Sequence, residues 1–125
     1  MLQRVLDVGQ CDMDHGMICR LIQDHFDAEV IRAHSAAEAL TALRAGSFEL
    51  VLTNRLLDRD QNEGLDLIRQ IKSDAGLSSV PVMLVTNLPE QEQQAVAVGA
   101  EPGFGKLALD SEQTLQRLSR VLAAK

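Results

Sequence analysis

The sequence predicts an α/β fold in which helices cover both faces of a doubly wound, five-stranded parallel sheet. Short strand-like apolar runs alternate with helix-like stretches five times along the chain, an order of elements typical of such sheets. One run, from Val80 to Val85, is almost continuously apolar, as expected of a central strand buried on both faces. With 125 residues and 46% hydrophobic content, the chain fits a single domain spanning residues 1–125.

The first half of the chain supplies three strands and two helices. Residues 4–8, 29–33 and 48–53 are the expected strands. The first helix has apolar residues at three-to-four spacing and starts near Asp12 or Asp14, either of which can cap it. Ser35 and Glu38 form a predicted capping box, so the second helix begins there, and it ends at Gly46.

The second half begins with a polar, irregular loop over residues 54–63, after which a helical stripe resumes. Residues 80–85 are the expected fourth strand. Pro89 opens the fourth helix and Gly99 closes it. Residues 101–106 are expected to form the fifth strand, although its proline and glycines weaken it, and Asp110 is expected to cap the last helix.

Composition argues against several classes of function. The net charge is −6 and no Lys/Arg cluster is present, so direct nucleic-acid binding is not expected. The chain has no Trp and no Tyr, so little is available for stacking bases or lining an aromatic pocket. No apolar stretch is long enough for a membrane span and no signal peptide is evident, which favours a cytoplasmic protein with reduced cysteines.

Four motifs occur in a suggestive order and spacing: residues 48–54 (FELVLTN), 63–69 (EGLDLIR), 81–86 (PVMLVT), and Gly99–Ala100 leading to Lys106. Together with five βα units, they resemble the receiver domain of two-component response regulators. That CheY-like family has a flavodoxin-like fold with strand order 2-1-3-4-5. The resemblance runs essentially from end to end.

The resemblance implies a phosphorylation pocket from which key groups are missing. In the family, an aspartate ending the third strand accepts a phosphoryl group, and two acidic residues after the first strand help to hold magnesium. A hydroxyl residue and a lysine end the fourth and fifth strands. Here Asn54 falls at the acceptor position, Gly9 and Gln10 at the acidic pair, and Thr86 and Lys106 at the last two.

A carboxamide such as that of Asn54 has neither the charge nor the nucleophilicity needed to form an acyl phosphate. Magnesium prefers anionic oxygens in octahedral array. We therefore expect no catalytic residue, no cofactor, and weak or absent magnesium binding in this degenerate pocket.

The resemblance also implies a signalling face that includes Gly103, Phe104 and Leu107. Gly103 falls where many receivers carry an aromatic residue that reports phosphorylation to the fourth helix, fifth strand and fifth helix, so that relay cannot operate in its usual form. Phe104 is expected to point to the opposite side of the strand. Leu107 replaces a proline that usually follows a cis bond, and we expect a trans bond here.

Other carboxylates could compensate for the missing ones. The loop from Asn54 is two residues longer than usual and adds Asp58 and Asp60. These either restore metal affinity or, as we favour, belong to a solvated loop without fixed geometry. Asp7 lies inside the first strand, where a buried carboxylate must be partnered, protonated or at a frayed edge. It pairs with Lys106 or Arg55, or the strand register differs by a residue or two.

Cys11, His15 and Cys19 fall close together, and the last two are four residues apart on one helical turn. The spacing suits two ligands of a transition metal. No second Cys/His pair supplies further ligands, so we favour a helix start with a small core cysteine.

The sequence therefore predicts an atypical receiver, a pseudo-receiver that is a binding module and not an enzyme. It is expected to signal through protein partners at the fourth helix, fifth strand and fifth helix, independently of phosphorylation; homodimerisation remains open. The alternatives are a metal- or small-ligand-responsive sensor and an inert oligomerisation domain.

Overall fold

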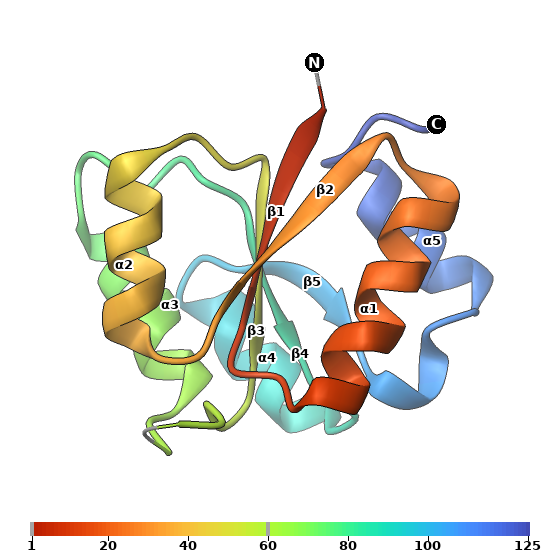
Figure 1. Cartoon of the computed structure of the whole chain (residues 1–125). Helices are drawn as coiled ribbons and strands as arrows, with labels where there is room; N and C mark the ends of the chain where they lie inside the picture. The colour runs from red at the N-terminus through yellow and green to blue at the C-terminus, as the bar shows by residue number, and fades with distance from the viewer. Residues whose placement is uncertain (1, 60) are drawn as a thin grey trace.

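The five strands form one sheet in the order β2-β1-β3-β4-β5, with every neighbouring pair parallel (Figure 1). The computed structural model describes residues 2–59 and 61–125. The strands are β1 (Gln3–Val8), β2 (Ala28–Ala33), β3 (Leu50–Asn54), β4 (Val82–Val85) and β5 (Glu101–Phe104). The helices are α1 (Asp12–His25), α2 (Ala36–Ala45), α3 (Gly64–Ser73), α4 (Pro89–Ala97) and α5 (Glu112–Ser119). The predicted fold class and strand order are confirmed.

The sheet separates two apolar cores, because successive side chains of a strand point to opposite faces. Val5, Leu50 and Leu52 pack with residues of α1 and α5. Leu6 and Val51 pack instead with residues of α2, α3 and α4. Figure 1 shows α1 and α5 on one side of the sheet and α2 and α3 on the other. Because all neighbouring strands are parallel, the loops that follow them lie at a single edge of this three-layer structure.

The start of α1 differs from the prediction. Cys11 is the N-cap residue and its side chain makes no capping hydrogen bond. Asp12 and Asp14 instead form ion pairs, with Arg32 at 2.7 Å and with Lys106 at 2.6 Å. The expected aspartate cap was wrong because these carboxylates lie inside the first turn, where they face cations on other elements.

A serine caps each of the two other helices whose caps were predicted, α2 and α5. The Ser35 hydroxyl accepts from the Glu38 N–H as predicted, but the Glu38 carboxylate accepts from the His34 N–H, one residue beyond the capping box. The last helix is capped by Ser111, whose hydroxyl accepts from the Thr114 N–H. The Asp110 cap was therefore wrong by one residue.

The fifth strand is shorter than predicted. It ends at Phe104, and residues Lys106–Ala108 form a 3₁₀ turn. Its pairing with β4 shifts register between Met83 and Val85, which is the signature of a bulge. The strand therefore does not continue to Lys106.

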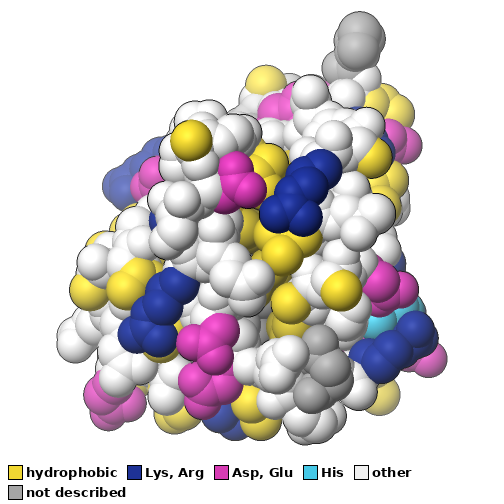
Figure 2. Space-filling view, turned by 90° about the vertical axis from the view of Figure 1, so that its left-hand side faces the viewer, with side chains coloured by type: hydrophobic (Ala, Val, Ile, Leu, Met, Phe, Trp, Pro, Cys, Tyr) yellow, Lys and Arg dark blue, Asp and Glu magenta, His cyan; other side chains and the backbone are white. Residues whose placement is uncertain are grey.

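The outer face of α2 and α3 carries acidic and basic side chains interspersed with one another (Figure 2). Within residues 2–59 and 61–125, no helix is long and apolar enough to cross a membrane.

Candidate functional site

An open depression of about 430 Å³ lies at the carboxyl edge of the sheet. Asn54, Thr86 and Lys106 all line it, together with Arg55 and Leu56. In open α/β sheets this edge is the usual place for ligands, at the point where the strand order reverses. The order reverses here between β1 and β3, so Asn54 ends a strand at that point.

The Asn54 carboxamide ties together the loops that follow β1 and β3. Its Nδ2 donates hydrogen bonds to the backbone carbonyl of Leu56 at 2.7 Å and to that of Gly9 at 3.3 Å. A carboxylate has no hydrogen to donate. An aspartate at this position would therefore face two carbonyl oxygens without a bond to either.

Gly9 is required by the backbone at the end of β1. Its φ is +77°, a left-handed conformation, and a Cβ built there would lie 2.7 Å from the Cα of Leu57. Side chains other than hydrogen are strained in that conformation. The sequence suggested only a lost carboxylate at Gly9, whereas the structure shows that a turn and a close backbone approach also demand glycine.

Asp7 lies in β1 with a fully buried side chain and has a partner on α1. Its Oδ2 is 2.7 Å from His15 Nδ1. Burial raises the pKa of Asp7 to about 6, against the hydrogen bond and charge of His15, which lower it. Partnering was thus predicted correctly, but the suggested partners, Lys106 and Arg55, were wrong.

The partner of Asp7 comes from α1 because of the face of the sheet on which Asp7 lies. Asp7 shares the face of Val5, which is covered by α1. Asp7 lies inside β1, as expected, opposite Arg32 on one side and Leu52 on the other.

Gln10 is also buried, at 1% exposure, and neither polar atom of its amide has a hydrogen-bond partner. The amide nevertheless lowers the pKa of Asp7. We interpret this as a close approach without a formed hydrogen bond. Gln10 therefore lies beside Asp7 and does not line the depression.

Thr86 and Lys106 are both engaged by neighbouring groups. The Thr86 Oγ1 accepts from the Leu88 N–H at the start of α4. The Lys106 ammonium lies 2.6 Å from the Asp14 carboxylate, and this contact holds the pKa of Asp14 below its usual range. The structure thus places both residues at the depression, with the lysine charge balanced by α1.

Backbone hydrogen bonds hold the described part of the rim loop, residues 55–59 and 61–63, so the interpretation of a loop without fixed geometry was wrong for that part. The Leu57 N–H donates to the Asn62 carbonyl, and the Gln61 N–H donates to the Leu57 carbonyl. The Leu57 side chain is fully buried in the core, which anchors the loop. Asp58 pairs with His34 at 3.0 Å, and Asp60 lies outside the described residues.

Cys11, His15 and Cys19 were considered as metal ligands, but His15 contacts Asp7 and Cys19 instead. His15 Nδ1 is engaged by Asp7, and the Cys19 sulfur lies 3.4 Å from Nε2 and 4.0 Å from Nδ1 of the same ring. Burial raises the pKa of the Cys19 thiol, and Cys11 is exposed. Within the described ranges, no three His, Cys, Asp or Glu side chains are grouped to hold a metal ion.

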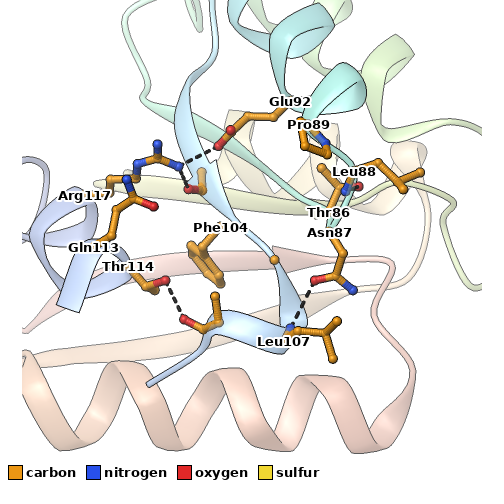
Figure 3. A pocket seen from close by; sticks show the side chains of 13 residues that line it. Thr86, Asn87, Leu88, Pro89, Glu92, Phe104, Leu107, Gln113, Thr114 and Arg117 are labelled. Carbon is orange, nitrogen blue, oxygen red and sulfur yellow. Dashed lines mark hydrogen bonds and ion pairs between the residues drawn. The ribbon is translucent and has the colours of Figure 1, made fainter. Parts of the chain in front are cut away.

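A second hollow, about 280 Å³ in volume, lies between α4 and α5 across β5 and is called the α4–α5 groove below (Figure 3). The Arg117 guanidinium crosses it, 2.8 Å from the Glu92 carboxylate, and donates to the Gly103 carbonyl. Leu107 stands at its edge with 87% exposure, and its N–H donates to Asn87 Oδ1.

Gly103 and Phe104 differ in part from expectation. A Cβ on Gly103 would lie 2.5 Å from the Leu84 carbonyl oxygen, so this backbone accepts no aromatic residue there. Phe104 was expected to point away from this side. It packs with the α1 and α5 core and also lines the α4–α5 groove (Figure 3), because the bulge interrupts strict alternation. The Lys106–Leu107 bond is trans, as expected.

No protein-family model matches the sequence. Among solved structures, the fold is similar to that of a putative response regulator from Chloroflexus aurantiacus. The TM-score is 0.86 at 19% identity, covering 98% of this chain and 99% of that one. The chain has a receiver-domain fold.

Two further solved structures of receiver proteins have a similar fold. Vibrio cholerae chemotaxis protein CheY4 is 24% identical with a TM-score of 0.78, covering 98% of this chain and 100% of that one. The phosphorylated cyanobacterial phytochrome response regulator RcpA is 20% identical with a TM-score of 0.71, covering 97% and 89%.

Sequence reasoning on this receiver fold missed three contributors: Asp14, His15 and Asn87. Asp14 was considered only as a helix cap, and His15 only as a candidate metal ligand, an interpretation that was not favoured. A usable signal existed for His15, because a buried carboxylate on the strand face covered by α1 calls for a donor from α1. Nothing local in the sequence marks Asn87 as the acceptor for the Leu107 N–H.

Proposed function

We propose that this chain is a receiver-fold signalling module that acts through protein–protein contacts, without aspartyl phosphorylation and without magnesium. The observation that carries the proposal is the pair of hydrogen bonds from Asn54 Nδ2 to the Gly9 and Leu56 carbonyls. A neutral amide thereby performs the bridging that a cation could otherwise provide between these loops.

The residues present do not suit magnesium. The ion demands near-ideal octahedral oxygen coordination and favours carboxylates. Gly9 offers no side chain, Gln10 is neutral and buried, and the two carbonyls at the depression already accept from Asn54. An Nδ2–H group pointing at these oxygens competes directly with a cation.

The same groups do not favour phosphoryl transfer. The Asn54 carboxamide is a poor nucleophile, since its nitrogen lone pair is delocalised and its oxygen is uncharged. The Lys106 charge is balanced by Asp14, so less of it remains to stabilise an incoming phosphoryl group. Enzymatic activity is not part of the proposal.

For the contact surface we propose the α4–α5 groove and its apolar rim. Leu88 and Leu107 are large apolar residues exposed at 47% and 87%, and both line the groove. Because Gly103 carries no ring, signalling by ring rotation is not available. Any switching then requires a partner that binds two conformations of the module with different affinity.

The first test is chemical. The protein is incubated with magnesium and a small phosphoryl donor and then weighed by intact-mass spectrometry. We expect no added mass. A phosphate-sized increment that maps to the peptide around Asn54 would refute the proposal.

The second test addresses the amide bridge through Asn54→Asp, with Asn87→Asp as the matched control. Asn87 uses its Oδ1 as an acceptor, a role that a carboxylate retains. In chelator, Asn54→Asp should lower the melting temperature and Asn87→Asp should change it little. Magnesium should restore stability to Asn54→Asp alone. A wild-type protein that magnesium stabilises equally would contradict the bridge.

The third test addresses the contact surface. Leu107→Glu should weaken association with a co-purifying partner, or with a second copy measured by sedimentation, by about tenfold, corresponding to ~1.4 kcal/mol. Leu2→Glu is the control, because Leu2 is also exposed but precedes β1 at the opposite edge of the sheet. Equal effects of the two variants would exclude the groove as the contact surface.

A further inference from the structure

Several buried polar atoms in β1, β2 and the loop that follows β1 lack hydrogen-bond partners. They are Asp7 Oδ1, both polar atoms of the Gln10 amide, and Arg32 Nε. Asp7 and Arg32 are direct neighbours across β1 and β2. Buried polar groups are nearly always hydrogen-bonded in native proteins. Asp7 Oδ1 and Gln10 Oε1 are acceptors, for which a bound proton can supply the hydrogen, whereas Gln10 Nε2 and Arg32 Nε are donors.

We propose that Asp7 is a proton-binding site and that its occupancy sets the hydrogen bonding of the loop formed by Gly9 and Gln10. Asp7 Oδ1 and Gln10 Oε1 are buried acceptor oxygens that form no hydrogen bond, although the Gln10 amide lies close enough to lower the pKa of Asp7. A proton taken from solvent forms an O–H bond on Oδ1, and the carboxyl group becomes neutral. That O–H can then donate to the Gln10 amide oxygen.

The ionised state calls for the opposite arrangement of Gln10. Without a proton on Oδ1, the amide satisfies the carboxylate by presenting its Nε2–H, which requires a half-turn of the carboxamide. In both states Oδ2 keeps its contact with His15 Nδ1 at 2.7 Å. The orientation of the Gln10 amide therefore reports whether Asp7 carries a proton.

The surroundings of Asp7 make proton binding favourable near neutral pH. From α1 it meets His15 and Cys19, from β2 Arg32, and from its own loop Gln10; its neighbour on β3 is the uncharged Leu52. The Arg32 charge is shared with Asp12 at 2.7 Å. Burial outweighs these contacts and raises the pKa of Asp7 to about 6.

The loop connects this proton site to the depression. The Gln10 backbone carbonyl accepts from Arg32 Nη2 at 2.9 Å, and the adjacent Gly9 carbonyl accepts from Asn54. A change in the Gln10 side chain is thus one residue away from the amide bridge. Protonation of Asp7 would reach the outer surface through this short path.

The test is a pH titration of the complete chain by NMR between pH 4 and pH 8. The Asp7 carboxyl carbon and the Gln10 side-chain amide should shift together, with a common midpoint near 6. Asp14 serves as the internal control, because its contact with Lys106 lowers its pKa. The ring signals of His15 are followed separately, so that changes at the ring are distinguished from changes at Asp7. An Asp7 midpoint in the ordinary aspartate range, or a Gln10 amide that does not follow it, would overturn the proposal.

Two variants sharpen the test. Asp7→Asn should remove the pH dependence of the Gln10 amide signal. Gln10→Leu should raise the Asp7 midpoint, because the amide lowers the pKa of Asp7, and Gln94→Leu on the exposed side of α4 should leave it unchanged. If Asp7→Asn does not fold, Gln10→Leu still decides, since an unmoved Asp7 midpoint there contradicts the coupling.

Discussion

The depression at Asn54 and the α4–α5 groove are held together by different kinds of contact. At the depression, a neutral amide joins two backbone carbonyls. Across the groove, Arg117 and Glu92 form an ion pair whose side chains are 23% and 27% exposed. Salt screens a partly exposed ion pair, whereas it has little effect on neutral hydrogen bonds. The comparison teaches that the first region is a fixed connection and the second an adjustable one.

The largest change in stability is expected when a glycine is replaced in either region, because close backbone contacts require glycine in both. Gly9→Ala should lower the free energy of unfolding by ~3 kcal/mol, because of its positive φ and the contact with Leu57. Gly103→Ala should lower it by ~2 kcal/mol, because its Cβ meets the Leu84 carbonyl. Urea unfolding measures both.

The control for these two variants is Gly16→Ala. Gly16 lies in the middle of α1 and a Cβ there meets no atom within 4 Å. Alanine should therefore raise the free energy of unfolding, by ~0.5–1 kcal/mol. A loss of stability at Gly16, or none at Gly9, would show that the close approaches are not what demands glycine.

The second prediction separates the regions by pH. The folded chain binds the Asp7 proton more tightly than the unfolded chain, because the pKa rises from 3.8 to about 6 on folding. The wild type should therefore lose up to ~3 kcal/mol of stability as the pH rises between those values, relative to Asp7→Asn. Parallel stability profiles of the two proteins would contradict this. Glu92→Gln, in the groove, is the control expected not to remove the dependence.

The smallest effect concerns salt. A double-mutant cycle on Arg117→Met and Glu92→Gln should give a coupling free energy of ~1 kcal/mol at low salt. At molar salt the coupling should fall, whereas the destabilisation by Asn54→Asp in chelator should persist. A coupling that salt leaves unchanged would remove the contrast between the adjustable groove and the fixed depression.

Much of the fold was predictable because the local spacing of apolar residues indicates which side chains are buried. The alternation of apolar runs indicated the elements, and the continuous run ending at Val85 marked a central strand. The end of β5 was not predictable, because the bulge opposite Met83 and Val85 arises from pairing between strands distant in sequence. The predicted aspartate cap of α1 failed for a similar reason, since Asp12 and Asp14 form ion pairs with Arg32 and Lys106 from other elements.

At the candidate site, too, some features were predictable from the sequence and others depended on contacts between distant segments. That Asn54, Thr86 and Lys106 gather at one depression followed from the resemblance, because the carboxyl ends of parallel strands share an edge. Their bonding partners did not follow. The Lys106 partner is on α1 and the Asp7 partner is His15, and neither choice can be read from strand spacing.

The neutral amide at the end of β3, and the absence of a carboxylate in the loop after β1, follow directly from the amino-acid sequence. Those are matters of covalent chemistry, and folding cannot alter them. What that amide binds, why Gly9 must be glycine, and which groups face the buried Asp7 depend on how the chain folds. These depend on distances between segments far apart in the chain, and packing of the whole sheet with its helices sets such distances.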